Sequence, residues 1–149
     1  MQLEKELKDK IPFRSLYSKT IVNIVYTANW VQDRFNDYLR PEQITWQQFN
    51  ALRILERSNK TISTKDLKAL MVDKNSDASR LIDRMVLKGL VQKKISETDL
   101  RKLVITITPD GLALLKRLES RFEQLEKIVN TLTKQETAAL NKLLDKMRG

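Results

Sequence analysis

The sequence predicts a mainly α-helical fold that contains one small β-hairpin. Apolar residues recur at three-and-four spacing along most of the 149 residues, as they do on one face of a helix. Glycine and proline number three each, and the glycines stand at predicted helix boundaries or at the terminus. Only residues 90–95 and 103–107 alternate apolar and polar side chains around a turn, which is the pattern of two paired strands.

The first half of the chain should form two helices. A long helix is predicted over residues 17–39, and Pro41 ends it. The next helix begins at a capping box made by Thr45 and Gln48. Its inner stripe consists of Trp46, Phe49, Leu52 and Leu55.

Two shorter helices are expected before the hairpin. Residues 61–63 should be extended, and Thr64 or Ser63 should cap a third helix whose inward side chains are Leu67, Leu70 and Met71. A polar turn leads into a fourth helix, for which Asn75 and Ser76 are the candidate N-caps. Gly89 ends this helix, and its apolar stripe is Ala78, Leu81, Ile82 and Met85.

The hairpin is followed by two more helices. Thr108-Pro109-Asp110-Gly111 has the composition of a helix start, with a hydroxyl cap, a proline and an acid in the first turn. The helix it begins should carry Leu112, Leu115, Leu118, Phe122, Leu125, Ile128 and Leu132. A second capping box, Thr133 with Glu136, starts a last amphipathic helix that carries Leu140, Leu143, Leu144 and Met147.

The charge of the chain suits a polyanionic partner. The formal net charge is +9, and residues 60–102 hold eleven Lys and Arg against six Asp and Glu. A generally basic, solvated surface is the other interpretation of this bias. Within 75–107, a helix with a polar N-terminal end precedes a hairpin whose turn is charged, which is the order of a winged helix-turn-helix. Sequence-specific DNA binding is therefore the leading hypothesis.

Several classes of protein are disfavoured by composition. The chain has no cysteine and no histidine, which removes disulfides, thiol chemistry and the commonest metal ligands, so we expect no metal site and no cofactor. No nucleophile–base pair or phosphate-binding glycine loop is present, and we expect no enzyme. No apolar run reaches a membrane span, and the charged N-terminus lacks a signal sequence, so a cytoplasmic protein is expected.

The chain resembles the multiple antibiotic resistance regulator (MarR) family of bacterial transcription factors. The resemblance rests on residues 66–71, 75–85, 88–91, 99–101 and 107–111, and the order of elements matches over nearly the whole chain. In the wing, Leu100 stands where the family usually has arginine, and the turn 73–76 is more polar than is common. The resemblance implies one MarR-like domain over 1–149. Its DNA-binding lobe would be 45–108, and 1–40 with 109–149 would form a helical dimerisation region.

The candidate DNA-binding residues lie on the two short helices and on the hairpin. Arg80 is suited either to a bidentate contact with guanine or to a phosphate clamp, and Arg101, held by Asp99, to a narrow minor groove or to a mere surface salt bridge. For Asp83 and Arg84 an intramolecular ion pair is expected instead. The full set is Thr64, Lys65, Asn75, Ser76, Asp77, Ser79, Arg80, Lys93, Lys94, Asp99, Arg101 and Lys102.

The resemblance also implies partners. It predicts a homodimeric repressor, joined through the terminal helices, that binds a pseudo-palindromic operator and is released by a small aromatic, anionic ligand. Tyr26, Trp30, Trp46 and Arg53 are candidates to line the ligand site, although aromatic residues at helical spacing are more often plain core. The alternative function is a winged-helix module that binds protein and not DNA.

Overall fold

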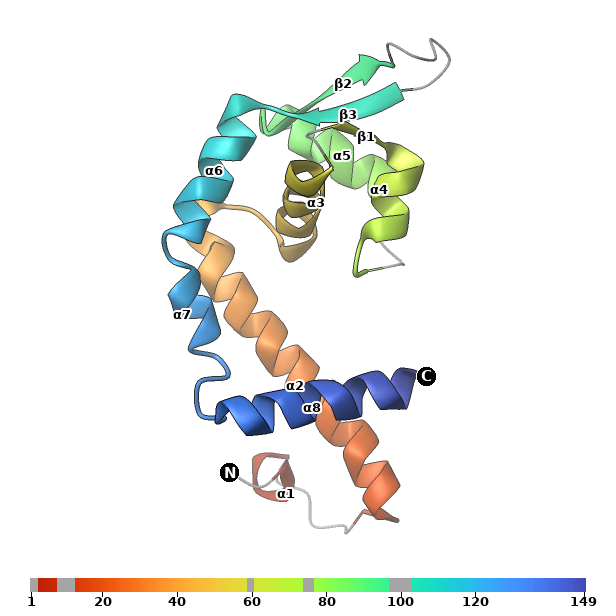
Figure 1. Ribbon diagram of the computed structural model, residues 1–149, viewed down its shortest axis with the longest axis vertical. Coiled ribbons are helices and arrows are strands. Elements are labelled where there is room, and N and C mark those ends of the chain that lie inside the picture. Colours follow the sequence, from red (N-terminus) through yellow and green to blue (C-terminus); the bar gives the residue numbers. More distant parts are fainter. Residues whose placement is uncertain (1–2, 8–12, 59–60, 74–76, 97–102) are drawn as a thin grey trace.

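The computed structural model describes residues 3–7, 13–58, 61–73, 77–96 and 103–149. The molecule is elongated, with a lobe of short helices and a small sheet at one end and long terminal helices at the other (Figure 1). The described chain is mainly helical with one antiparallel sheet. This confirms the predicted fold class.

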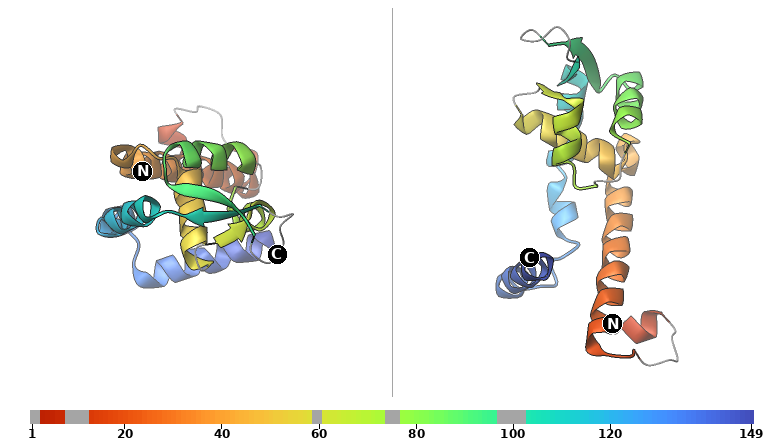
Figure 2. Two further views of the ribbon diagram at one scale, coloured as in Figure 1. Left: turned by 90° about the horizontal axis from the view of Figure 1, so that it is seen from above. Right: turned by 90° about the vertical axis from the view of Figure 1, so that its right-hand side faces the viewer.

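The N-terminal part consists of a short helix and a long one. α1 (Leu3–Glu6) was not expected from the sequence, and it is tied to α2 by an ion pair of 2.6 Å between Lys19 Nζ and Glu4 Oε1. α2 (Leu16–Leu39) begins at a capping box formed by Ser15 and Ser18. The 3-10 turn η1 (Arg40–Glu42) contains Pro41 and follows α2 directly, as predicted. α2 thus forms a straight connection from the terminal region to the lobe (Figure 2).

The core of the lobe is built around α3 (Trp46–Arg57). Its predicted capping box is present: Thr45 N donates to Gln48 Oε1 at 3.1 Å, and Gln48 N donates to Thr45 Oγ1 at 3.3 Å. Leu52 and Leu55 are fully buried, and they pack in one cluster with side chains from the other elements of the lobe, including Leu67, Ile82, Met85 and Ile105.

The sheet has three strands where the sequence indicated a two-stranded hairpin and a short extended segment. β1 (Thr61–Ser63), β2 (Val91–Ile95) and β3 (Leu103–Ile107) are ordered β1-β3-β2, and both pairings are antiparallel. The register of the hairpin pairs Val91 with Ile107 and Ile95 with Leu103, which confirms the predicted strands. The extended segment joins the sheet because its backbone groups pair with the free edge of β3.

Two short helices lie between β1 and β2. α4 (Thr64–Leu70) is capped by Ser63, whose hydroxyl accepts from Asp66 N at 3.1 Å, and α5 (Ala78–Leu87) is followed by Gly89 at φ +70°. The expectation that Leu70 faces inward was wrong, since it is 57% exposed. α4 ends at that residue, whereas Leu67 and Met71, which were also predicted to face inward, are fully buried.

The single helix predicted over 109–132 is also wrong. α6 (Pro109–Glu119) begins at Thr108 as expected, but a break at Ser120–Arg121 separates it from α7 (Phe122–Glu126). Ser120 Oγ donates to Arg117 O, and the Arg121 guanidinium pairs with Glu42 at 3.2 Å. These contacts redirect the chain, although the leucine spacing continues through the break.

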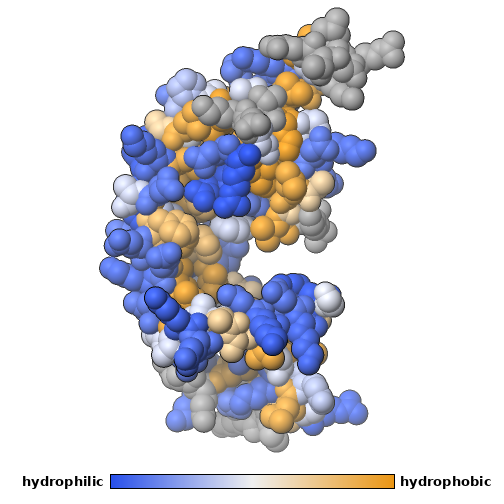
Figure 3. All heavy atoms as spheres, viewed as in Figure 1, coloured by the Kyte–Doolittle hydropathy of each residue, from blue (hydrophilic) through white to orange (hydrophobic). Residues whose placement is uncertain are grey.

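The last helix is the least embedded part of the molecule. α8 (Lys134–Arg148) starts at the predicted capping box of Thr133 and Glu136, and none of its described residues is buried. In the side view it stands apart from α2 (Figure 2). Apolar side chains remain open on the surface of the molecule in the space-filling view (Figure 3). None of the described helices combines the length and apolarity that a membrane crossing requires.

Candidate nucleic-acid interface

The first two turns of α5 present a polar surface, although Val86 and Leu87 at the C-terminal end of the helix are exposed apolar residues. Ala78, Ile82 and Met85 are buried against the lobe, as the predicted stripe requires. Ser79, Arg80, Asp83 and Arg84 are exposed on the remaining surface of the helix. The helix therefore offers polar side chains to a partner from its first turn onward.

The N-cap of α5 is Asp77, and the expectation that Asn75 or Ser76 caps this helix was wrong. The Asp77 side chain accepts a hydrogen bond from Arg80 N at 3.2 Å. A carboxylate is a favourable cap because it satisfies a free backbone N–H and its charge opposes the positive end of the helix dipole. Asp77, which the sequence suggested as a DNA-contacting residue, thus has a structural role as well.

Arg80 is the most accessible cation on this part of the helix. Its side chain is 82% exposed, and its Nε lies 3.2 Å from Asp77 Oδ2. An exposed pair of this kind contributes little to stability. The guanidinium can therefore exchange the carboxylate for a phosphate or a base edge at small cost, and Ser79 lies exposed beside it.

The strand β2 adds two lysines with different surroundings. Lys93 Nζ forms an ion pair of 2.5 Å with Asp83 Oδ1 on α5. The ion pair expected for Asp83 is therefore present, and it links the strand to the helix. Lys94 follows on the opposite face of the strand and is exposed.

The remaining candidates divide by position. On α4, Lys65 and Lys68 are exposed, and Thr64 is half-buried at the first helical position. The structure thus gathers Asp77, Ser79 and Arg80 at one end of α5, with Lys93 and Lys94 on the neighbouring strand. Five predicted residues lie outside the described part of the chain: Asn75, Ser76, Asp99, Arg101 and Lys102.

Sequence reasoning missed Lys88, which anchors the other end of α5. Its Nζ donates to the backbone carbonyl of Gln43 and lies 3.5 Å from Gln48 Oε1. Gln48 is the one buried polar side chain among the described residues, and Gln43 has a left-handed backbone at φ +53°. A lysine at the C-cap of a helix was visible in the sequence as a C-terminal signal, but its partners come from a distant turn.

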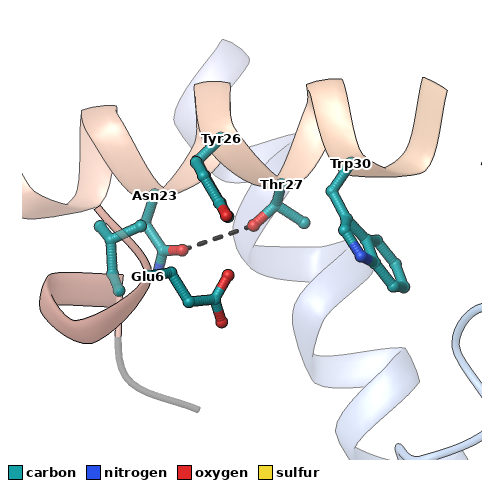
Figure 4. A pocket seen from close by; sticks show the side chains of 6 residues that line it. Glu6, Asn23, Tyr26, Thr27 and Trp30 are labelled. Carbon is teal, nitrogen blue, oxygen red and sulfur yellow. Dashed lines mark hydrogen bonds between the residues drawn. The ribbon is translucent and has the colours of Figure 1, made fainter. Parts of the chain in front are cut away.

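The four residues suggested for a ligand site do not share one cavity. Tyr26 and Trp30 line a cavity of about 430 Å³ between α1 and α2 (Figure 4). Trp46 packs against Phe35 and Phe49, with ring centroids 4.4 and 6.0 Å away. Arg53 NH1 lies 3.9 Å from Glu56 and 4.0 Å from Glu119. Among the described residues, no cluster of three or more acidic, histidine or cysteine side chains could hold a metal ion.

Comparison with known proteins places the chain in a family. The MarR family model matches residues 44–103. The chain is similar to the multiple antibiotic resistance protein MarR of Salmonella typhimurium, with 31% identity over 127 residues that make up 83% of this chain and 88% of that protein.

Two solved structures share the fold. A mutant of Escherichia coli MarR complexed with operator DNA has a TM-score of 0.73 and 24% identity, with 99% of both chains covered. Bordetella bronchiseptica BpsR, whose DNA binding is regulated by 6-hydroxynicotinic acid, has a TM-score of 0.75 and 23% identity, with 88% of this chain and 99% of that chain covered.

These findings agree with the polar-tipped helix, the wing strands and the long terminal helices described above. Members of the matching family are transcription regulators and not enzymes. The chain belongs to the MarR family of winged helix-turn-helix, DNA-binding transcriptional regulators.

Proposed function

We propose that the protein is a homodimeric repressor that binds a pseudo-palindromic operator through α5 and the wing. The observation that carries this proposal is the division of the first two turns of α5, residues 78–84, into an apolar face turned to the lobe and an exposed polar face. A helix held in this way can enter a major groove while its inner face stays in the lobe. The Escherichia coli relative, whose structure is a complex with operator DNA, supports DNA as the partner.

Within this proposal each exposed group has a role. Arg80 contacts a guanine edge or a phosphate, and Ser79 and the amide end of the helix contact the backbone. Lys65 and Lys94 supply attraction that does not depend on sequence and weakens as salt rises. Beyond the described residues, Arg101 and Asp99 are proposed to form the tip that reaches the minor groove. The lobe that does this spans 45–108.

The dimer is proposed to form through 1–40 and 109–149. In one chain the N-terminal half of α2 exposes Leu16 by 81%, Tyr17 by 85% and Ile21 by 64%. On α8, Leu143 and Met147 are 64% and 56% exposed. Large apolar surfaces of this kind are seldom left in water, and a two-fold contact would cover both helices. The two α5 helices would then lie roughly 34 Å apart, one turn of DNA.

Fluorescence anisotropy with DNA from the protein's own promoter region tests the proposal. We expect Arg80→Ala to weaken binding by about 1–3 kcal/mol. Arg40→Ala is the matched control, because the exposed Arg40 also pairs with an aspartate three residues earlier but lies in η1, outside the lobe and away from the exposed apolar residues of α2 and α8. Equal affinities of the wild type and Arg80→Ala would contradict the proposed role of α5. Binding that does not respond to salt would contradict DNA recognition altogether and favour a protein partner.

Repression and ligand control complete the proposal. A dimer that covers promoter DNA excludes other proteins from it, and a ligand that binds one orientation of the two lobes better than another shifts the population between them. The regulation of BpsR by a small aromatic acid supports a ligand-responsive regulator. A reporter gene placed under the protein's own promoter should be more active when the gene for the regulator is deleted. Lower activity after deletion would identify an activator.

A further inference from the structure

The cavity between α1 and α2 has the size of a small-molecule site. It has a volume of about 430 Å³, within the roughly 300–1,000 Å³ usual for such sites. Side chains from both helices point toward it (Figure 4). They are Leu3, Glu6, Asn23, Tyr26, Thr27 and Trp30.

The described residues that line the cavity carry one negative charge. Among the described residues Glu6 is the one charged side chain that lines it, and the ammonium of the neighbouring Lys19 is engaged with Glu4 at 2.6 Å. Hydrogen bonding to the Glu6 carboxylate raises the pKa of Tyr26. The phenol therefore keeps its proton and adds no negative charge of its own, and an anionic ligand would meet the Glu6 side chain as the one charged group of the described lining.

The aromatic residues of the cavity suit a cation. Tyr26 and Trp30 lie one helical turn apart on α2, and both line the cavity. The Arg34 guanidinium lies 5.3 Å from the centroid of the Trp30 ring, so this ring already takes part in a cation–π contact. Thr27 Oγ1 donates to Asn23 Oδ1 at 3.4 Å, which leaves the Asn23 amide nitrogen and the Thr27 oxygen as further polar groups.

We propose that this cavity binds an organic cation, an ammonium group attached to an apolar or aromatic body. The ammonium group pairs with Glu6 and rests against Tyr26 and Trp30, while the apolar body lies along Leu3. The further idea that this cation controls DNA binding as an effector rests on the proposed function. It differs from the sequence-based expectation of an anionic effector. Arg53 is the one cation among the four residues suggested for the ligand site, and neither Arg53 nor Trp46 lines this cavity.

Isothermal titration calorimetry on the full-length protein tests the sign of the preferred charge. The probes are benzyltrimethylammonium and benzoate, two aromatic ions of opposite charge. We expect the wild type to bind the cation at least about tenfold more tightly than the anion. Equal or tighter binding of benzoate, or no binding of the cation, would overturn the proposal.

Three variants assign the site. Glu6→Gln keeps the shape of the side chain and should weaken cation binding by about tenfold, and Glu6→Lys should reverse the preference between the probes. Glu123→Gln removes one exposed carboxylate on α7 and should change neither affinity. Circular dichroism verifies that each variant is folded. Cation binding unchanged by both substitutions of Glu6 would overturn the assignment.

Operator binding is measured on the same samples without a probe. If even the wild type fails to bind DNA, the proposed function fails, while the calorimetry still decides the ligand class.

Discussion

The winged-helix lobe and the terminal helices are built on opposite principles. In the lobe, side chains from α3, α4, α5 and the sheet meet in one core, and Leu52, Leu55, Leu67 and Met85 are completely buried. The terminal region has long helices with good caps and little interior: none of the described residues of α8 is buried. Helices in both regions have N-cap hydrogen bonds and apolar residues at helical spacing. The difference teaches that local helix signals do not reveal whether a helix is covered by its own chain or by another.

The largest effect is expected when a side chain in the core of the lobe is truncated. Leu52→Ala removes a fully buried side chain, and should lower the free energy of unfolding by about 2–5 kcal/mol. Leu87→Ala is the same substitution in the same lobe at a residue that is 87% exposed, and should cost less than about 0.5 kcal/mol. Urea denaturation measures both. Similar losses would mean that the lobe does not depend on this core.

The terminal region should respond in association rather than in folding. Leu143→Glu places a charge on the exposed apolar face of α8, and should weaken dimerisation by about a hundredfold, because a charge would have to be buried unpaired. Asn141→Glu adds the same charge to an exposed polar residue of this helix and should have little effect. Sedimentation equilibrium distinguishes the two. A monomeric wild type would refute the assignment of α8 as an interface.

A smaller effect is expected at the junction of the regions. A Cβ on Gly111 would lie 2.3 Å from Leu90 O and 2.8 Å from Ile107 Cγ1, so α6 begins in close contact with the sheet. Gly111→Ala should destabilise the protein by about 1–3 kcal/mol through this overlap. Gly89→Asn is the control, because a Cβ there meets no described atom within 4 Å and asparagine tolerates a left-handed backbone. Thermal melts that rank the control as the more damaging would contradict this.

The smallest effect concerns the first turn of α8 in acid. Hydrogen bonds from Thr133 N and the Thr133 hydroxyl lower the pKa of Glu136 below 4.5. A lowered folded pKa stabilises the helix above the unfolded value, and this contribution is lost as the pH falls through the folded pKa. Amide protection at the start of α8 should therefore decrease below about pH 4.5. In Glu136→Gln the protection should be insensitive to this pH change, and an unchanged wild type would exclude the effect.

Most of the fold was predictable because it depends on interactions between residues that are close in the sequence. The capping boxes at Thr45 and Thr133, the proline after the long helix and the alternating strands all depend on neighbouring residues, and all are confirmed. The errors arose where a residue distant in the sequence determines the local backbone structure. The chain breaks at Arg121, whose guanidinium pairs with Glu42, and the short segment at Thr61–Ser63 becomes a strand by pairing with β3.

The candidate interface was predictable to a similar degree. The exposed face of α5 follows from its periodicity, whereas the choice of Asp77 as N-cap depends on where the turn ends, which three adjacent polar residues leave open. The cavity between α1 and α2 was not predicted as such, although two of the residues suggested for a ligand site line it. Tyr26 and Trp30 share a helix face, but Glu6 joins them only because α1 folds back on α2. Arg101 lies outside the described residues, so its role stays a prediction.

The clamp at the end of α2 has a mechanical consequence. Glu42 holds both Arg117 and Arg121, at 3.0 and 3.2 Å, and the Tyr38 hydroxyl donates to Leu118 O, so the end of α2 is joined to α6 and α7. α2 is 24 residues long, about 36 Å at 1.5 Å per residue. A tilt of α2 by about 5° about this clamp would therefore displace its far end by about 3 Å. A small movement of the N-terminal segment would thus correspond to a change in the angle between α2 and the DNA-binding lobe.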